Sequence, residues 1–292
     1  MRRSIFILLF IAVSLVSCNK LYNEINDDSK VLLQTKLIEI EETKAYASEL
    51  GSAYLDYSKI AISLEDENGN AYDGHEEYKN VKVSANGRFI SPSINMYLSN
   101  TKGVLYSYYP YNESVTDITS IPVEITTQTD YMYGTPALDL NNKNFTAPVN
   151  LNHALSIIRL RIYKGTYGFE GNITNITVKG ENLASEAYLN IKNGELSEFS
   201  GINQSQQFVF NPFKISGNDV RLELFVLPTN EEKELFFTFT LDGKEWEIKT
   251  MPLQITPGKV VEYKVTFNSQ NTKLGEPTVN AWASEKKEDL TN

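Results

Sequence analysis

Few side chains in this sequence are of the types that bind metals or act as nucleophiles. The 292 residues include one cysteine, Cys18, and two histidines, His75 and His153. A metal site needs several ligands that converge on the ion, and these three residues have no paired spacing. We therefore expect no metal site, and we expect His153 to be a core or sheet-edge residue.

Carboxylates occur as adjacent pairs at Asp27-Asp28, Glu41-Glu42 and Glu76-Glu77. Two carboxylates can hydrolyse a glycosidic bond when they face each other across a site, but neighbours on a strand point to opposite faces. The segment 66–70 (DENGN) resembles part of a calcium loop, yet it lacks the spacing that ends in a bidentate glutamate, so it predicts a turn. Neither a P-loop nor a glycine-rich dinucleotide fingerprint is present. The sequence thus predicts no cofactor and no enzyme.

Cys18 follows an N-terminal segment with the layout of a secretory signal. Arg2 and Arg3 form a basic start, residues 5–13 are an unbroken apolar run, and Ser17 is the small residue before the cysteine. The run is shorter than the about 20 apolar residues that a membrane span needs. We predict that residues 1–17 are a signal peptide that is cut between Ser17 and Cys18.

Three roles can be weighed for the Cys18 thiol. A buried structural thiol does not fit a segment that leaves the folded protein, and a disulfide needs a second cysteine, which the chain lacks. The stretch 15–18 (LVSC) resembles the bacterial lipobox, in which the thiol takes a diacylglycerol and the new amine of the cysteine is acylated. Each buried methylene of a lipid contributes about 0.8 kcal/mol, so three chains hold a protein firmly. Cys18 is therefore the predicted lipidation site, which leaves no Cys–His pair for catalysis, and residues 18–30 are the predicted tether.

The composition after the signal peptide is acidic and rich in residues that favour strands. Removing Arg2 and Arg3 leaves 25 basic against 37 acidic side chains, a net charge of −12. Nucleic acid favours basic surfaces, so we expect no nucleic-acid partner. The 17 tyrosines and 14 phenylalanines, together with few helix-favouring blocks, indicate a β-rich fold.

Apolar and polar residues alternate in several segments, as in strands that cover a core on one side. The clearest segments are 220–227 (VRLELFVL), 234–241 (ELFFTFTL) and 259–267 (KVVEYKVTF). Asp242-Gly243 and Asn193-Gly194 are typical of hairpin turns. The pattern predicts an all-β fold of antiparallel sandwiches. An Asn-rich stretch at 141–150 separates two strand-rich halves, which predicts an N-terminal domain over 31–146 and a C-terminal domain over 147–292.

The segment 149–163 changes its alternation partway along. Leu151, His153, Leu155 and Ile157 share one parity, and the apolar residues at 158, 160 and 162 share the other. We predict a β-bulge near 156–158, because one extra residue brings both sets onto one core face.

Four stretches have an order and spacing that resemble those of a known family. They are 108–111 (YYPY), 128–134 (QTDYMYG), 153–156 (HALS), and 257–259 (PGK) followed by 279–282 (VNAW). Together with the lipobox, they resemble the fimbrillin family, the lipoprotein pilins of type V pili, over nearly the whole chain.

This resemblance implies two transthyretin-like antiparallel β-sandwich domains in tandem. It also implies export as a surface-exposed outer-membrane lipoprotein and later incorporation into a fimbria that contributes to adhesion. In the family, a trypsin-like protease cuts after a basic residue and removes the first strand, and a strand from another pilin subunit fills the groove. An empty sheet position leaves backbone groups unpaired and apolar pockets open, which favours such strand addition.

The predicted removable strand is 31–42 (VLLQTKLIEIEE), and two lysines are candidates for the cleavage point. Lys44 lies in the loop that is expected to follow, at the place where the family carries its basic residue. Lys36 lies inside the predicted strand, where pairing protects it, so Lys44 is the favoured site. Either lysine can also be an ordinary surface residue.

The C-terminal end departs from the pattern of a stalk pilin. Ten residues follow Trp282, whereas stalk pilins of the family carry a longer, alternating donor segment. Residues 273–283 can instead form the last strand of the second domain, as in a tip or accessory subunit that accepts a strand and donates none. The alternative function is a surface lipoprotein that does not polymerise and binds a host glycan or protein. Six tyrosines between 106 and 133 could stack on sugars, although we expect them to pack in the core or between domains.

Overall fold

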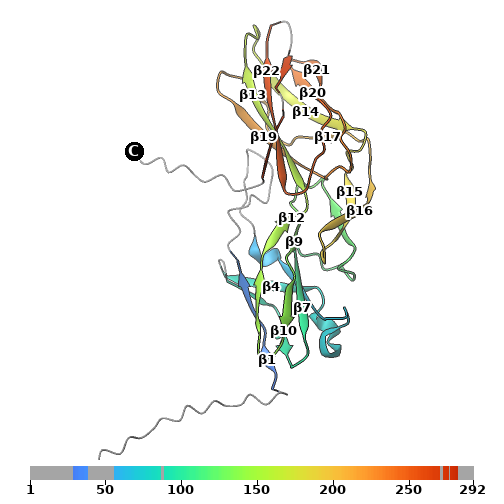
Figure 1. Ribbon diagram of the computed structural model, residues 1–292. Helices are drawn as coiled ribbons and strands as arrows, with labels where there is room; N and C mark the ends of the chain where they lie inside the picture. The colour runs from blue at the N-terminus through green and yellow to red at the C-terminus, as the bar shows by residue number, and fades with distance from the viewer. Residues whose placement is uncertain (1–28, 39–55, 87–88, 270–271, 276, 282–292) are drawn as a thin grey trace, which may run out of the picture.

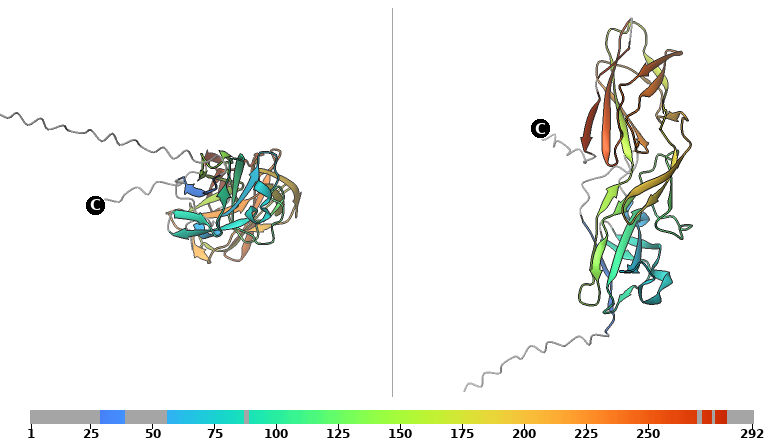
Figure 2. Two further views of the ribbon diagram at one scale, coloured as in Figure 1. Left: turned by 90° about the horizontal axis from the view of Figure 1, so that it is seen from below. Right: turned by 45° about the vertical axis from the view of Figure 1, so that its right-hand side comes forward.

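β-Strands form almost all of the regular structure in this protein. A computed structural model describes residues 29–38, 56–86, 89–269, 272–275 and 277–281. The helices in these ranges are the short 3₁₀ turns η1 (Tyr57–Lys59), η2 (Tyr72–Gly74) and η3 (Glu76–Tyr78), and none is long and apolar enough to cross a membrane. The predicted all-β class is confirmed. The strands form an elongated body with the two halves of the sequence toward opposite ends (Figure 1 and Figure 2).

The N-terminal half is organised around a seven-stranded sheet. Its strands, in spatial order, are β12 (Leu151–His153), β9 (Met132–Gly134), β7 (Gly103–Tyr109), β3 (Ala61–Asp66), β4 (Val81–Asn86) and β5 (Phe89–Pro92), with β10 (Ala137–Leu140) also on β7. Two short pairs are β1 (Val31–Leu32) with β6 (Tyr97–Leu98), and β2 (Gln34–Leu37) with β11 (Thr146–Val149). The sheet and both pairs contribute to one apolar core, the N-terminal core, which includes Leu64, Leu98 and Val149.

The C-terminal half is a β-sandwich of two five-stranded sheets. One contains β19 (Val220–Val226), β13 (Ser156–Lys164), β22 (Lys259–Phe267), β23 (Thr272–Leu274) and β24 (Thr278–Ala281), and the other contains β17 (Gln206–Gln207), β14 (Asn172–Gly180), β20 (Leu235–Leu241), β21 (Lys244–Lys249) and β18 (Phe213–Lys214). The alternation in β20 buries its apolar face as the sequence predicted. Phe237 of β20 meets Tyr263 of the facing sheet with ring centroids 5.3 Å apart. Large aromatic side chains of this kind dominate the energetics of a core.

A three-stranded sheet joins the two halves. It combines β8 (Ile121–Glu124) of the first half with β15 (Glu186–Asn190) and β16 (Glu195–Ser200) of the second. The junction cluster, a third group of buried apolar residues, includes Tyr108 of the first half and Phe225 of the second. Lys192 Nζ also lies 2.6 Å from the carboxylate of Glu65, a buried residue of β3. The halves therefore share a packed junction.

The change of parity in 149–163 marks a change of sheet. β12 pairs with β9 in the N-terminal half, whereas β13 begins at Ser156 and pairs with β19 without a register shift. Ile157 packs in the junction cluster and Ile158 packs in the sandwich core, so both faces of β13 are covered. The predicted β-bulge near 156–158 is wrong, because the pattern combines two strands of different sheets. The predicted boundary between 146 and 147 would place β12 in the second half, but β12 pairs in the N-terminal half and the chain crosses between His153 and Ser156.

The predicted hairpins are present, but two strand pairs are parallel. β20 and β21 meet at Asp242-Gly243, and β15 and β16 meet at Asn193-Gly194. Gly194 has a φ of +79°, and a Cβ there would lie 2.1 Å from the ring of Tyr133, so this turn requires glycine. The pairs β13–β22 and β2–β11 are parallel. A period-two pattern does not distinguish parallel from antiparallel pairing.

Candidate functional site

The first described strands, β1 and β2, pair with strands of the N-terminal half. β1 pairs antiparallel with β6, and β2 runs parallel to β11. The backbone N–H groups of Leu33, Gln34 and Ile38 donate hydrogen bonds to the carbonyls of Met96 (2.8 Å), Phe145 (2.8 Å) and Val149 (2.9 Å), respectively. These main-chain bonds hold the segment in place without depending on the identity of its side chains.

The side chains of this segment alternate between the core and the surface. Leu33 is 3% exposed, and Leu37 packs against the N-terminal core. The hydroxyl of Thr35 donates a hydrogen bond to the carbonyl of Ile90 at 2.8 Å. The Lys36 side chain is exposed. Burying a leucine contributes about 1.5–3 kcal/mol. Because Leu33 is the one buried side chain among residues 31–38, side-chain burial stabilises the docked strand by little more than this amount.

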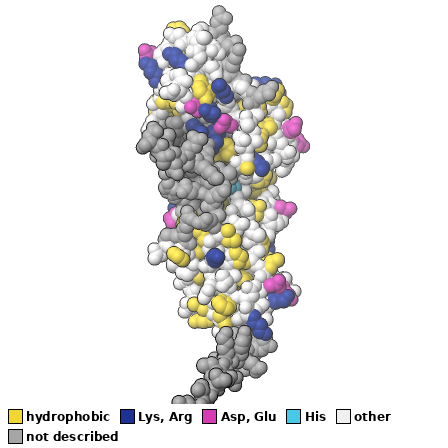
Figure 3. Space-filling view, turned by 60° about the vertical axis from the view of Figure 1, so that its left-hand side comes forward, with side chains coloured by type: hydrophobic (Ala, Val, Ile, Leu, Met, Phe, Trp, Pro, Cys, Tyr) yellow, Lys and Arg dark blue, Asp and Glu magenta, His cyan; other side chains and the backbone are white. Residues whose placement is uncertain are grey.

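The pair of β1 with β6 carries exposed apolar side chains. Leu32 is 46% exposed, and its partner across the β1–β6 pair, Tyr97, is 41% exposed. Figure 3 shows several groups of hydrophobic side chains on the lower half of this face of the molecule.

The predicted processing residues divide between the described and the undescribed parts of the chain. Ser17, Cys18 and Lys44 lie outside the described residues. Lys36 lies in β2, and its register partner is Pro148 of β11. The predicted strand 31–42 is present as β1 and β2 up to residue 37, with a change of pairing partner at residue 33.

The C-terminal strands β23 and β24 both pair with β22. β23 lies along the end of β22, and β24 lies along its start. The expectation that 273–283 pair with the second half is confirmed for the described residues, as two short strands instead of one. All four side chains of β24 are exposed, and Val279 is 47% exposed. Backbone pairing therefore attaches β24, and its side chains add nothing to the sandwich core.

The six tyrosines between 106 and 133 pack in and around the junction. Tyr108 is buried in the junction cluster, and Tyr109 is buried in the N-terminal core. The other four, at 106, 111, 131 and 133, are partly buried against the junction cluster. Core and interface packing is thus confirmed for these residues. Burial raises the pKa of the Tyr108 hydroxyl to about 12.

A buried pair of ionisable side chains lies at the junction, and the sequence did not reveal it. Nδ1 of His153 is 2.6 Å from Oδ2 of Asp130, whose side chain is fully buried. Burial raises the pKa of Asp130, and the His153 imidazole opposes this shift. His153 lies in the edge strand β12, as expected, and Asp130 precedes β9, the strand with which β12 pairs. Only the pairing of these two strands brings the two residues together, because 23 positions separate them.

The other acidic candidates that the structure describes lie on the surface or in a turn. Glu76 and Glu77 are exposed and pair with Lys79 at 2.7 Å and His75 at 2.6 Å. Asp66 accepts hydrogen bonds from two backbone N–H groups of the predicted turn. The other two acidic pairs lie outside the described residues. Within the described ranges, no group of three His, Asp or Glu side chains could hold a metal ion.

Comparison with known proteins covers most of the chain. A family model described as fimbrillin-like matches residues 43–282. No curated protein matches the chain. The fold is similar to that of a candidate cell adhesion protein from Bacteroides uniformis, with a TM-score of 0.66 and 14% identity over 87% of this chain and 99% of that chain. A candidate cell adhesion protein from Bacteroides ovatus gives a TM-score of 0.63 and 13% identity over 88% and 99% of the two chains. For a fimbrial protein from Bacteroides vulgatus the values are 0.53 and 11% over 86% and 99%.

Proposed function

We propose that this chain, which belongs to the fimbrillin-like family, is a fimbrial subunit whose first strand is exchanged for a strand of another subunit. As a member of this family it is a structural protein and not an enzyme. Its partners are other fimbrial subunits, and its place is the cell surface, within a fimbria.

The way in which β1 and β2 pair with the N-terminal half is the observation that supports strand exchange most strongly. The segment contributes main-chain hydrogen bonds and one fully buried side chain, Leu33, to the N-terminal half. Any extended segment can make the same main-chain bonds, so a donor strand can take this place. A donor needs an apolar residue at the position of Leu33 and a small residue at that of Thr35.

Lipid attachment at Cys18 is proposed for the stage before assembly. A cut between Ser17 and Cys18 frees the amine of Cys18, and lipid on the cysteine then holds the protein at the outer membrane. Cys18→Ser is expected to abolish incorporation of labelled palmitate and to leave the signal peptide attached. Ser14→Ala, which keeps the stretch LVSC, is the matched control. Normal labelling of Cys18→Ser would contradict the proposal.

Cleavage after Lys44 is proposed as the step that frees the first strand. Limited tryptic digestion of the folded, unlipidated chain 19–292 is expected to give one new N-terminus at Ala45. The product is then run unboiled on a denaturing gel, where a ladder of stable oligomers reports strand exchange. Lys44→Gln is expected to abolish both the cut and the ladder, whereas Lys36→Gln leaves both unchanged.

The outcomes of this digestion separate the alternatives. Complete resistance, or cutting only within 19–30, contradicts the removable strand. A clean cut without a ladder identifies a subunit that needs partner subunits, as expected for a tip or accessory position. The pairing of β24 with β22 supports that position, because a strand already paired within its own domain is not free to be donated.

A further inference from the structure

We propose that a pocket at the junction of the two halves binds one neutral sugar ring of a glycan. The pocket has a volume of about 430 Å³ and is lined by residues 110–113, residues 121–122 and Tyr131. It lies between the end of β7, the start of β8 and the segment that leads into β9. A volume in this range is typical of small-molecule sites.

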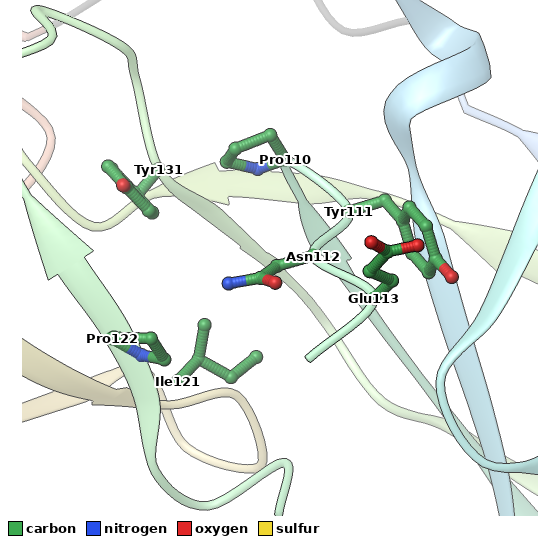
Figure 4. A pocket seen from close by; sticks show the side chains of 7 residues that line it. All are labelled: Pro110, Tyr111, Asn112, Glu113, Ile121, Pro122 and Tyr131. Carbon is green, nitrogen blue, oxygen red and sulfur yellow. The ribbon is translucent and has the colours of Figure 1, made fainter. Parts of the chain in front are cut away.

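The Asn112 side chain supplies a fixed hydrogen-bond donor to this pocket. Its Oδ1 accepts hydrogen bonds from the backbone N–H of Ser114 at 3.0 Å and from the Ser114 hydroxyl at 2.7 Å. These bonds orient the amide, so Nδ2 faces the pocket with no acceptor among the described residues. Figure 4 shows Nδ2 directed into the space between Tyr131 and Pro122. Both N–H groups of this amide are therefore available to a ligand.

The loop that carries Asn112 is held in place by partly buried hydrogen bonds to Asn80. The Asn112 carbonyl accepts a hydrogen bond from Asn80 Nδ2 at 2.9 Å. The hydroxyl of the buried Tyr108 donates to Asn80 Oδ1 at 2.6 Å, and Asn80 Nδ2 also donates to the carbonyl of Val115 at 2.9 Å. A site held in this way loses little conformational entropy when it binds a ligand.

The remaining lining groups match the chemistry of a sugar. The Glu113 side chain is exposed and lies beside Tyr111, on the side of Asn112 away from Tyr131 and Pro122 (Figure 4). Its carboxylate can accept hydrogen bonds from hydroxyl groups, and its negative charge disfavours an acidic sugar. Tyr131 and Pro122 provide apolar surface on either side of the space that the Asn112 amide faces, and the C–H face of a pyranose can pack against it. A sugar ring thus offers acceptors for Asn112, donors for Glu113 and apolar surface for these two side chains.

A proline-rich peptide is the competing ligand for a pocket that contains tyrosines and prolines. Such a peptide offers carbonyl groups to Asn112, but proline has no N–H to donate to Glu113. A ligand that offers acceptors to Asn112 and donors to Glu113, as a sugar does, therefore matches the lining better than such a peptide.

The pocket lies away from the ends of the molecule. Residues 121–122 belong to β8, which pairs with β15 of the second half. In an end-to-end fibre, a site at this position faces sideways and stays accessible. This last statement rests on the proposed fimbrial role, whereas sugar binding by the pocket does not.

Saturation-transfer difference NMR on the chain 19–292 tests the proposal with galactose, N-acetylgalactosamine, glucose and mannose as probes. We expect at least one of them to receive saturation. Asn112→Asp keeps the oxygen that accepts from Ser114 but replaces the two donors by a charged acceptor, and is expected to weaken binding at least about tenfold. Glu113→Gln is expected to weaken it about fivefold, because a charged acceptor is lost. Asn141→Asp, in another exposed turn whose Oδ1 accepts from Lys143 N–H, is the matched control and leaves binding unchanged.

Absence of saturation transfer to all four sugars would overturn the proposal. Equal transfer in the unmodified chain and in Asn112→Asp would also overturn it, because the sugar would then bind elsewhere. Binding of a proline-rich peptide that is lost in Asn112→Asp would assign the pocket to a peptide ligand instead. These measurements use the monomer, so failure of the chain to polymerise leaves them interpretable.

Discussion

Replacing Leu33 by aspartate is expected to release the first strand from the N-terminal half and to speed tryptic cleavage after Lys36 by roughly 100-fold. Leu33 is 3% exposed and packs in the N-terminal core. Removing a buried leucine costs about 2–5 kcal/mol, and a carboxylate in its place loses its hydration without gaining a partner. When a segment opens and closes rapidly, proteolysis follows its open population, which rises about tenfold for every 1.4 kcal/mol.

Gln34→Asp is the matched control for this experiment. Gln34 is the next residue, its side chain is exposed, and the substitution adds the same charge to the same strand. Its cleavage rate is expected to stay within about twofold of the unmodified chain, as for most surface substitutions. The time course of the fragment that begins at Leu37, followed by mass spectrometry, gives the rates. Equal cleavage rates in the two variants would show that burial of the Leu33 side chain does not hold the strand in place.

Replacing His153 by alanine is expected to lower the free energy of unfolding by about 3–5 kcal/mol. The fully buried carboxylate of Asp130 loses its partner at 2.6 Å, and its other oxygen, Oδ1, has no hydrogen-bond partner in the structure. Removing one member of a buried pair is costly because it leaves the other in a medium that solvates it poorly. Chemical denaturation followed by circular dichroism measures the loss.

The pH dependence of this loss separates electrostatics from packing. Burial raises the pKa of Asp130 and His153 opposes the shift, so removing His153 raises that pKa further. A carboxyl group with a raised pKa in the folded state favours folding in its protonated form. Below the unfolded pKa of about 3.9 the group is protonated in both states, so it costs no stability there. As the pH rises above this value, the folded state loses stability relative to the unfolded state. The deficit of His153→Ala is therefore expected to be largest at neutral pH and to shrink toward pH 4.

The second histidine provides the control for this prediction. His75 makes a contact of the same length, 2.6 Å, with Glu77, but its side chain is 32% exposed and that of Glu77 is 60% exposed. His75→Ala is expected to change the free energy of unfolding by less than about 1 kcal/mol at any pH, because exposed ion pairs contribute little. A deficit for His153→Ala that does not vary with pH would contradict the role given to Asp130.

Local patterns in the sequence were enough to define individual strands and turns. The alternation at 234–241 correctly placed one face of β20 in the core, because successive side chains of a strand point to opposite faces. Asp242-Gly243 and Asn193-Gly194 correctly marked hairpins, because these turns need residues that accept positive φ. These features depend on neighbouring residues only, so the local sequence suffices for them.

The tertiary structure alone decided which strands pair and what their pairing brings together. The parity change at 149–163 has the same local signature as a bulge, and only the partners of β12 and β13 show a change of sheet. The pair of Asp130 with His153, and the pocket around Asn112, combine segments that no local period relates. Pairing between distant segments is set by the burial of whole faces and the closure of the loops between them, and the period of a single strand carries no information about its partner.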